Sequence, residues 1–139
     1  MVSDLQLDMM CEIENLCYPE TTAYDRDMMR DLLEEPGTFL VCEWRGGRLA
    51  GFLVSQVSCA TIVTIDVHPD FRRQGIARLL MRRSLDILRE TGLKKIISQV
   101  GADNVPSLML HLQFGFRIQR RLRNYYGPAD DAVLMMRKF

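Results

Sequence analysis

A basic, glycine-containing segment directly follows a run of β-branched residues near the middle of this 139-residue sequence. The run ends at Val67, a proline stands at position 69, and the segment itself is Arg72, Arg73, Gln74, Gly75, Ile76 and Ala77. The pattern predicts a buried strand over 62–67, a turn over 68–70, and a helix from Gly75 onward. A helix start offers free backbone N–H groups and a positive dipole end, so this segment is suited to bind phosphate or pyrophosphate. Gly75 would let such a group approach the backbone closely.

A second set of polar residues lies on a short helix that we expect over 104–113. Its apolar residues follow the i, i+3, i+4, i+7 spacing and predict a buried stripe of Val105, Leu108, Met109 and Leu112. Asn104, Ser107 and His111 fall within about 60° of one another on the helical wheel, away from that stripe. We expect Asn104 to cap this helix. The polar line should therefore face something other than the core.

Composition limits the class of protein. With 47% hydrophobic residues, residues 1–139 fit one globular domain with a hydrophobic core. The 18 basic and 18 acidic residues balance, which argues against a general nucleic-acid or anionic-membrane surface. We therefore expect neither nucleic acid nor a membrane as a partner. The oligomeric state cannot be read from the sequence.

The cysteines and the N-terminal sequence indicate the compartment. Four cysteines show neither C-x-x-C spacing nor pairing with histidine, so we expect reduced core thiols and no metal site: Cys11, Cys17, Cys42 and Cys59. No basic segment precedes an apolar run at the N-terminus, and no window approaches the roughly 18 apolar residues that span a bilayer. These observations predict a soluble, cytoplasmic protein.

Two helices are expected ahead of the strands, over about 4–17 and 25–34. In the first, Leu5, Met9, Ile13 and Leu16 have helical spacing and predict the buried face. The second carries Met28, Met29, Leu32 and Leu33. This helix pair either covers the core or forms a flap on the substrate side, and the core-covering role is favoured.

The remaining elements predict a mixed sheet. Strands are expected over 39–44, 49–57, 60–67 and 93–100, and the glycines of Arg45-Gly46-Gly47-Arg48 predict a hairpin between the first two. A helix over 75–90 should connect strands 60–67 and 94–100 as a right-handed crossover, which makes those strands parallel. Two closing strands are expected over 116–126 and 132–138, with Tyr125 and Tyr126 on opposite faces. The result is an α/β fold with helices on both faces, and the phosphate-type turn at the carboxyl end of a parallel strand.

Several other chemistries have no motif in this sequence. The sequence lacks G-x-x-x-x-G-K-[ST], G-x-G-x-x-G, H-E-x-x-H and G-x-S-x-G. Nucleoside-triphosphate, dinucleotide, zinc-peptidase and serine-hydrolase sites are thereby disfavoured.

Two of these elements together resemble the GNAT superfamily of acyl-CoA-dependent N-acetyltransferases. The first is Arg72-x-x-Gly75-x-Ala77 between a strand and a helix, and the second is Asn104 opening a helix that ends in Phe114-Gly115-Phe116. The similarity extends over about residues 5–139. Within the superfamily, the segment Arg123-Asn124-Tyr125-Tyr126 resembles the ribosomal-protein alanine N-acetyltransferase group.

The resemblance implies a fold, a cosubstrate and a reaction. A GNAT-like sheet has six or seven strands with about four helices, six if the leading strand of the family is absent. Acetyl-CoA would bind through its pyrophosphate to the backbone of residues 72–77, and its pantetheine arm would pair with the backbone of Ile65, Asp66 and Val67. Asn104 and Ser107 would add contacts to the coenzyme. An uncharged amine would attack the thioester directly, so neither a covalent enzyme nucleophile nor a metal is required.

The catalytic residues depart from the family pattern. Relatives usually carry a glutamate or histidine base where this chain has Gln99, a tyrosine acid where it has His111, and a hydroxyl where it has Phe71. We assign His111 as the catalytic acid, because imidazolium can protonate a thiolate. The base is left open among Glu20, Asp103, Tyr125 and a water chain, and bulk solvent suffices for an amine of pKa near 8. Gln99, Tyr125 and Tyr126 are expected to line the substrate site.

Each interpretation has a plainer alternative. Arg72 and Arg73 would then be an ordinary basic turn, and His111 a half-exposed helix histidine. The arginines at 117, 120, 121 and 123 either attract an acidic peptide or form a solvated strand face, and the solvated face is favoured. The favoured function is an acetyl-CoA-dependent amine N-acetyltransferase acting on a protein or peptide N-terminus. The alternatives are a small-amine acetyltransferase and a non-catalytic module that binds or senses acyl-CoA.

Overall fold

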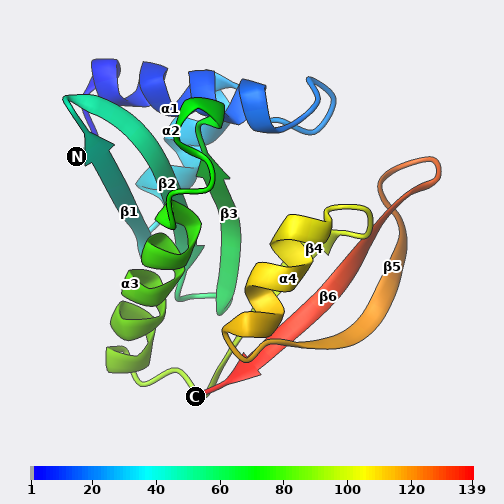
Figure 1. Ribbon diagram of the computed structural model, residues 1–139. Coiled ribbons are helices and arrows are strands. Elements are labelled where there is room, and N and C mark those ends of the chain that lie inside the picture. The colour runs from blue at the N-terminus through cyan, green and yellow to red at the C-terminus, as the bar shows by residue number, and fades with distance from the viewer. Residues whose placement is uncertain (1) are drawn as a thin grey trace.

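The computed structural model describes residues 2–139, and in them one mixed sheet of six strands carries helices on both faces (Figure 1). The strands lie in the order β1-β2-β3-β4-β6-β5. Their bounds are Thr38–Arg45 (β1), Arg48–Gln56 (β2), Thr61–Val67 (β3), Lys95–Gly101 (β4), Arg117–Gly127 (β5) and Asp130–Lys138 (β6). The helices are Asp4–Cys17 (α1), Arg26–Glu34 (α2), Ile76–Glu90 (α3) and Val105–Gln113 (α4), with a short 3-10 helix, η1, over Pro69–Phe71. The predicted fold class is confirmed, with six strands in the described residues.

The two central strands, β3 and β4, are parallel but pair over only two positions. Their register joins Thr61 to Ile97 and Ile62 to Ser98. Beyond these pairs the strands diverge toward their carboxyl ends, and Figure 1 shows the sheet opening there. The predicted parallel crossover is confirmed. Because ladder hydrogen bonds end where the strands separate, the rest of β3 has one edge without a strand partner.

The hairpin between β1 and β2 forms where glycine permits it. Gly46 and Gly47 have φ values of 57° and 79°, as a tight two-residue turn requires. Arg45 and Arg48 close the turn as a register pair. The prediction for this segment is confirmed.

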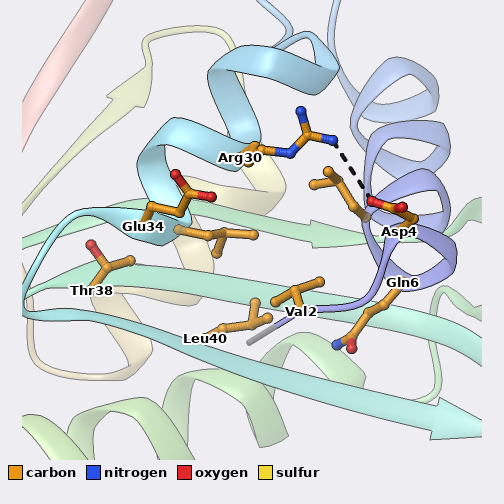
Figure 2. A pocket seen from close by; sticks show the side chains of 9 residues that line it. Val2, Asp4, Gln6, Arg30, Glu34, Thr38 and Leu40 are labelled. Atoms are coloured by element: carbon orange, nitrogen blue, oxygen red, sulfur yellow. Dashed lines mark ion pairs between the residues drawn. The ribbon is translucent and has the colours of Figure 1, made fainter.

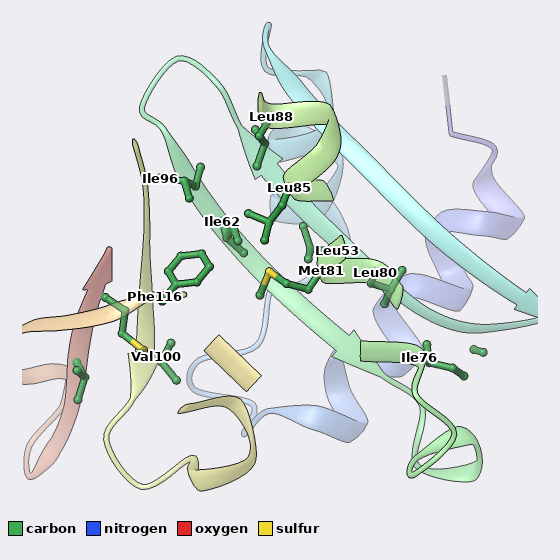
Figure 3. Close-up of a cluster of buried hydrophobic side chains, with 13 residues drawn as sticks. Leu53, Ile62, Ile76, Leu80, Met81, Leu85, Leu88, Ile96, Val100 and Phe116 are labelled. Carbon is green, nitrogen blue, oxygen red and sulfur yellow. The ribbon is translucent and has the colours of Figure 1, made fainter. Parts of the chain in front are cut away.

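One core lies between the sheet and the helices α3 and α4 (Figure 3). Phe116, at the end of α4, is fully buried beside Ile62, Ile96 and Met81. The buried apolar residues of α3 are Ile76, Leu80, Met81, Leu85 and Leu88. Burial of a side chain of this size contributes roughly 1.5–3 kcal/mol, so this layer fixes α3 firmly beneath the end of β3.

A second core lies beneath α1 and α2 on the opposite face of the sheet. Leu7, Met10 and Ile13 of α1 are buried there with Met29 of α2. The core-covering role of this helix pair is therefore confirmed.

The buried face predicted for α1 is wrong in two of its four positions, while Ile13 is buried and Met9 packs against the core. Leu5 and Leu16 are 69% and 51% exposed, whereas the buried residues include Glu14 at 2%. The helix is rotated relative to the predicted face because Leu7 and Met10 meet the apolar side chains of β2, including Phe52. This rotation places a carboxylate on the inner face of α1.

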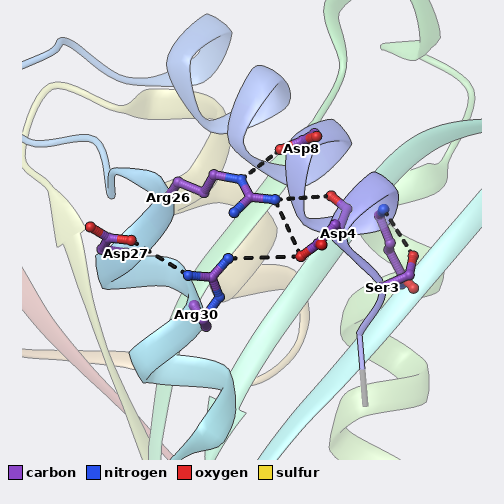
Figure 4. Close-up of polar contacts among 7 residues, drawn as sticks. Ser3, Asp4, Asp8, Arg26, Asp27 and Arg30 are labelled. Carbon is purple, nitrogen blue, oxygen red and sulfur yellow. Dashed lines mark hydrogen bonds and ion pairs between the residues drawn. The ribbon is translucent and has the colours of Figure 1, made fainter.

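Ion pairs join α1 to α2 at the surface (Figure 4). Arg26 lies 2.6 Å from Asp8 and 3.4 Å from Asp4, and Arg30 lies 3.8 Å from Asp4 and 3.6 Å from Asp27. All of these side chains are well exposed, so solvent screens the pairs. They orient the two helices, while the buried apolar residues supply the stability.

Candidate active site

A large cleft opens where β3 and β4 diverge. It has a volume of about 760 Å³ and extends beneath the connection between α1 and α2. Its walls come from α1, β3, β4, α4 and the end of β5, and include Ile65, Ser98, Gln99, Asn104, Ser107, His111, Tyr125 and Tyr126. The structure thus brings together seven residues that the sequence predicted to bind the coenzyme, to catalyse or to line the substrate site: Ile65, Gln99, Asn104, Ser107, His111, Tyr125 and Tyr126.

His111 lies at the base of α4 against β4 and is only 1% exposed. Its Nδ1 is 2.7 Å from the Ser107 carbonyl oxygen, and its Nε2 is 3.0 Å from Ser98 Oγ. Because a carbonyl oxygen can only accept, Nδ1 carries the proton, and Nε2 accepts from the Ser98 hydroxyl. Burial lowers the pKa of His111, partly offset by its bond to the Ser107 carbonyl. The ring is therefore held in its neutral form, and the half-exposed alternative for His111 is wrong.

The buried stripe predicted for α4 is wrong in two of its four positions. Val105 and Met109 are 59% and 51% exposed, while Leu108 and Leu112 are partly buried. The buried side of the helix is centred on His111, because that side faces β4 and the ring of Phe116, with ring centroids 4.9 Å apart. The prediction assumed that the apolar side of the helix is the buried side, so it could not identify a buried side that carries a histidine.

The free edge of β3 leads into the cleft. The carbonyl oxygens of Ile65 and Val67 point away from β2, since they accept from side chains outside the sheet. Tyr18 Oη is 3.3 Å from Ile65 O, and Cys17 Sγ and Arg72 Nε are each 3.4 Å from Val67 O. The backbone groups of Ile65 and Val67 thus face away from β2, which is the orientation that a ligand binding as an added strand requires.

Asp66, between them, is placed differently from the prediction. Its backbone belongs to the β2 ladder, where Asp66 O lies only 2.7 Å from the position that a Cβ at Gly51 would take. The expected backbone contact from Asp66 to a ligand is therefore wrong, because alternate residues of a strand face alternate edges.

The phosphate-type turn lies at the carboxyl end of β3, outside the lining of the cleft. Gly75 is the N-cap of α3 with φ 76°, and Arg73 has φ 62°. In residues 2–139 the first internal backbone bond of α3 runs from Leu79 to Gly75, so the N–H groups of Ile76 and Ala77 have no backbone acceptor. A Cβ placed on Gly75 would meet nothing within 4 Å. Free donors, positive helix dipole and open space together fit a phosphate group.

Asn104, Gln99 and two of the candidate bases lie in the cleft lining. Asn104 caps α4, with its Oδ1 accepting from the Ser107 N–H at 3.3 Å, as predicted. Gln99 lines the cleft, and its backbone carbonyl oxygen accepts a hydrogen bond from Tyr126 Oη at 3.3 Å. Of the side chains considered as the base, Asp103 and Tyr125 line the cleft and Glu20 does not.

Tyr125 and Tyr126 do not lie on opposite faces as predicted. Both line the cleft, with their rings in edge contact at 4.9 Å. The strand alternation fails because Asn124 has φ 54° and the register of β5 against β6 shifts between Leu122 and Gly127. Burial raises the pKa of Tyr126 to about 12, so its hydroxyl stays protonated at neutral pH.

The four arginines of β5 lie on an exposed strand face. Two of them make local contacts: Arg121 pairs with Asp131 at 2.6 Å, and Arg117 donates to the Phe116 carbonyl at 2.8 Å. Arg120 and Arg123 are exposed as well. Their exposure agrees with the solvated-face interpretation of this segment.

Sequence reasoning missed a pair of buried carboxylates beside the cleft. Glu14 lines it from α1, and Asp66 lies behind Thr64 on β3. A signal for Glu14 existed, since it continues the spacing of Leu7 and Met10, but a charged residue is normally assigned to the wet face.

A second cavity of about 550 Å³ lies far from these groups, between α1, α2 and β1 (Figure 2). Apolar side chains such as Leu7, Leu33 and Leu40 line it, and the Asp4–Arg30 ion pair crosses its rim. It contains none of the predicted site residues, so the cleft between β3 and β4 is the candidate active site.

Two features are absent from the described residues. Within 2–139, no helix has both the length and the apolar character needed to cross a membrane. In the same part of the chain, no three His, Cys, Asp or Glu side chains are grouped so as to hold a metal ion.

Comparison with known proteins gives consistent matches. The family model described as Acetyltransferase (GNAT) family matches residues 7–116. The ribosomal protein bS18-alanine N-acetyltransferase of Escherichia coli is 34% identical over 96 residues, and the matched segment spans 66% of this chain and 65% of that relative.

Solved structures match over nearly the whole chain. Ard1 from Thermoplasma volcanium has a TM-score of 0.89 at 25% identity, covering 99% of this chain and 93% of that one. The NatC complex bound to Gag peptide and CoA has a TM-score of 0.82 at 19% identity, covering 99% and 92%. The second likeness is one of fold alone.

Proposed function

Because this chain belongs to the acetyltransferase (GNAT) family, we propose that it transfers an acetyl group from acetyl-CoA to a primary amine. One observation carries the proposal: the uncapped start of α3 and the free edge of β3 lead, one after the other, into the cleft that holds His111. A ligand with a pyrophosphate at one end and an extended arm at the other fits this arrangement.

The chain supplies two binding elements for such a ligand. Backbone N–H groups over residues 74–77 hold the pyrophosphate, and Arg72 and Arg73 add positive charge nearby. The backbone of Ile65 and Val67 binds the pantetheine arm as an added strand. Acetyl-CoA supplies the acetyl group as an activated thioester. The N–H of Val67 is the donor that stabilises the developing oxyanion.

His111 serves as the proton donor on the thiol side of the cleft. Since its ring is neutral at rest, it first takes a proton on Nε2, with the Ser98 hydroxyl turning to release that nitrogen. The proton comes from the attacked amine nitrogen as the C–N bond forms, and it passes on to sulfur as the C–S bond breaks. His111 thus becomes protonated during the reaction and then acts as the acid.

The acceptor we propose is the N-terminal amine of a protein or peptide, which places the enzyme in the cytoplasm with newly made chains. Two observations support this choice. The curated relative acts on an alanine of a ribosomal protein according to its name, and a solved structure of this fold holds a peptide. The acceptor side of the cleft carries Tyr24, Tyr125 and Tyr126, whose rings are suited to pack against a peptide backbone.

Gln99 supports a second candidate function. Gln99 lines the cleft, and its side-chain amide can neither take nor give a proton at neutral pH. A non-catalytic module that binds acyl-CoA would need no base at all.

Release of free CoA thiol from acetyl-CoA distinguishes these functions. Peptides with a free N-terminal alanine, the same peptides blocked at the N-terminus, and small primary amines are compared at equal concentration. Thiol release with the free peptides alone is the expected result. Thiol release with small amines only would show that the substrate is a small amine and not a peptide. Tight binding of acetyl-CoA, with no thiol release in the presence of any amine, would establish the binding module instead.

A further inference from the structure

Two carboxylates from different elements meet behind one wall of the cleft. Glu14 projects from the inner face of α1, and Asp66 projects from β3 toward α1. Both residues are almost fully buried, at 2% and 1% exposed, and Glu14 lies close enough to act on the carboxyl group of Asp66. Two acidic groups so deeply buried are rare unless a partner satisfies them.

One oxygen of each carboxylate is fixed by a donor. Glu14 Oε2 accepts from the Tyr24 backbone N–H at 3.0 Å, and Asp66 Oδ1 accepts from Thr64 Oγ1 at 2.7 Å. The other two oxygens, Glu14 Oε1 and Asp66 Oδ2, have no hydrogen-bond partner among the described residues. Since both oxygens are acceptors, a proton held between the carboxyl groups would satisfy both of them.

The surroundings of the pair supply no countercharge. Glu14 or Asp66 acts on four neighbouring titratable groups, all neutral when protonated: Cys11, Cys17, Tyr18 and Tyr24. The nearby cation, Arg72, contacts Cys17 Sγ at 3.6 Å and not the carboxylates. In residues 2–139 no lysine, arginine or histidine forms an ion pair with either carboxylate. Burial, and then the contact with Glu14, raises the pKa of Asp66 well above its ordinary value. The raised pKa of Asp66 and the two unpartnered oxygens together fit one proton held between the carboxyl groups.

The pair is connected to the cleft by a hydroxyl group. Thr64 lines the cleft and donates to Asp66, and Glu14 itself contributes to the same wall. A hydroxyl that donates to a carboxylate can accept a proton from the other side and pass its own proton on. The cleft side of Thr64 is thus coupled to a buried negative charge.

Resting on the proposed function, we propose that Glu14 and Asp66 act together as the proton acceptor for the substrate amine, through the Thr64 hydroxyl. An N–H bond of the incoming ammonium breaks and an O–H bond to Thr64 forms, while the proton of Thr64 moves to Asp66 Oδ1. The shared proton shifts to Glu14 Oε1, so the pair becomes neutral with both groups protonated. The amine, now uncharged, forms the C–N bond as the C–S bond breaks, and the pair returns its extra proton to water.

The test compares isosteric variants across pH in the whole protein. Glu14→Gln and Asp66→Asn keep the shapes but remove the acceptor, and Glu12→Gln is the matched control because Glu12 is exposed on the same helix. We expect the two pair variants to lose at least about tenfold in kcat/KM at neutral pH and to approach the wild type above the amine pKa near 8. Glu12→Gln should follow the wild type throughout. Adding Gln99→Glu to Glu14→Gln should restore activity at neutral pH, since it places a new carboxylate in the cleft.

A second measurement needs no turnover. Infrared difference spectra of the wild type at neutral pH should contain the band of a protonated buried carboxyl group, and Asp66→Asn and Glu14→Gln should lose it. Absence of that band in the wild type would overturn the shared proton. In an active wild type, losses that are equal at every pH, or no loss, would overturn the role of the pair. If the wild type acetylates no amine, the proposed function fails on its own.

Discussion

His111 and Ser98 face each other across the interface of α4 and β4, with Nε2 and Oγ 3.0 Å apart and both residues almost fully buried. This contact fixes the ring from one side while the Ser107 carbonyl fixes it from the other. A short helix that carries few buried apolar residues is thus held to the sheet partly by a histidine. Burial lowers the pKa of the ring, and the bond to the Ser107 carbonyl partly offsets that effect.

Replacement of His111 by phenylalanine tests its role in proton transfer. We expect kcat to fall by about a hundredfold, because proton transfer to the leaving group contributes on this order. Met109→Ala, in the same helix and half exposed, should leave kcat unchanged. Steady-state kinetics of both variants checks the prediction, and an unchanged kcat for His111→Phe across the substrate panel would show that another group protonates the thiolate.

The buried ring of His111 should also make stability depend on pH. Since burial lowers the pKa of His111, the native state binds this proton less readily than the unfolded chain does. The stabilisation that His111 contributes to the folded state is therefore fully present above the pKa of an unfolded histidine, about 6.5. It is lost as the pH falls from there through the native pKa of His111. Urea unfolding from pH 8 to pH 5 measures it. The difference between wild type and His111→Phe should shrink toward low pH, and a constant difference would contradict the assignment.

Gly75→Glu should prevent binding of the coenzyme without unfolding the protein. A carboxylate at the start of α3 would occupy the open space and repel phosphate, so we expect CoA affinity to fall at least about tenfold, or about 1.4 kcal/mol. Gly92→Glu is the matched control. Gly92 follows the other end of α3, has φ 85° and also faces open space. Isothermal titration with CoA checks both variants, and tight binding by Gly75→Glu would disprove the placement of the pyrophosphate.

Gly51→Ala should destabilise the sheet beneath the site. An added Cβ would lie 2.7 Å from the Asp66 carbonyl oxygen and 3.2 Å from side chains of Ile76 and Leu80. Because backbone must move, we expect a loss of about 1–3 kcal/mol. Gly101→Ala, whose Cβ would meet Asn104 at an ordinary 3.6 Å, should change stability by less than about 0.5 kcal/mol. Chemical denaturation of both variants measures the difference, and equal stabilities would contradict the close approach of β2 and β3 at this position.

The order of the elements and the parallel pair could be predicted from the sequence because local signals marked each boundary. Pro69, Gly75 and the Gly46-Gly47 turn each impose a backbone conformation that few other residues adopt. The register and orientation of whole elements depend on contacts between distant residues, which no local pattern contains. For this reason the rotation of α1 that buries Glu14 was not predicted.

The site residues were likewise predicted where a local pattern marked them and missed where distant contacts decide. Asn104, Ser107 and His111 were found because they share one helix face, and the structure places all three in the cleft. The pair of Tyr125 and Tyr126 was misplaced because a left-handed residue, Asn124, breaks the alternation of the strand. Ser98 was missed because nothing in its neighbourhood along the chain distinguishes it from other strand serines. Its importance comes from a residue 13 positions away.

The most direct test of the proposed acetyl transfer uses one peptide that carries both a free N-terminal alanine and an internal lysine. The purified protein is incubated with this peptide and acetyl-CoA, and fragment mass spectrometry locates the acetyl group. Acetylation of the N-terminal amine, with one CoA released for each amide formed, is the predicted result. An unmodified peptide, for a protein that still binds acetyl-CoA and turns over no other amine, would contradict it.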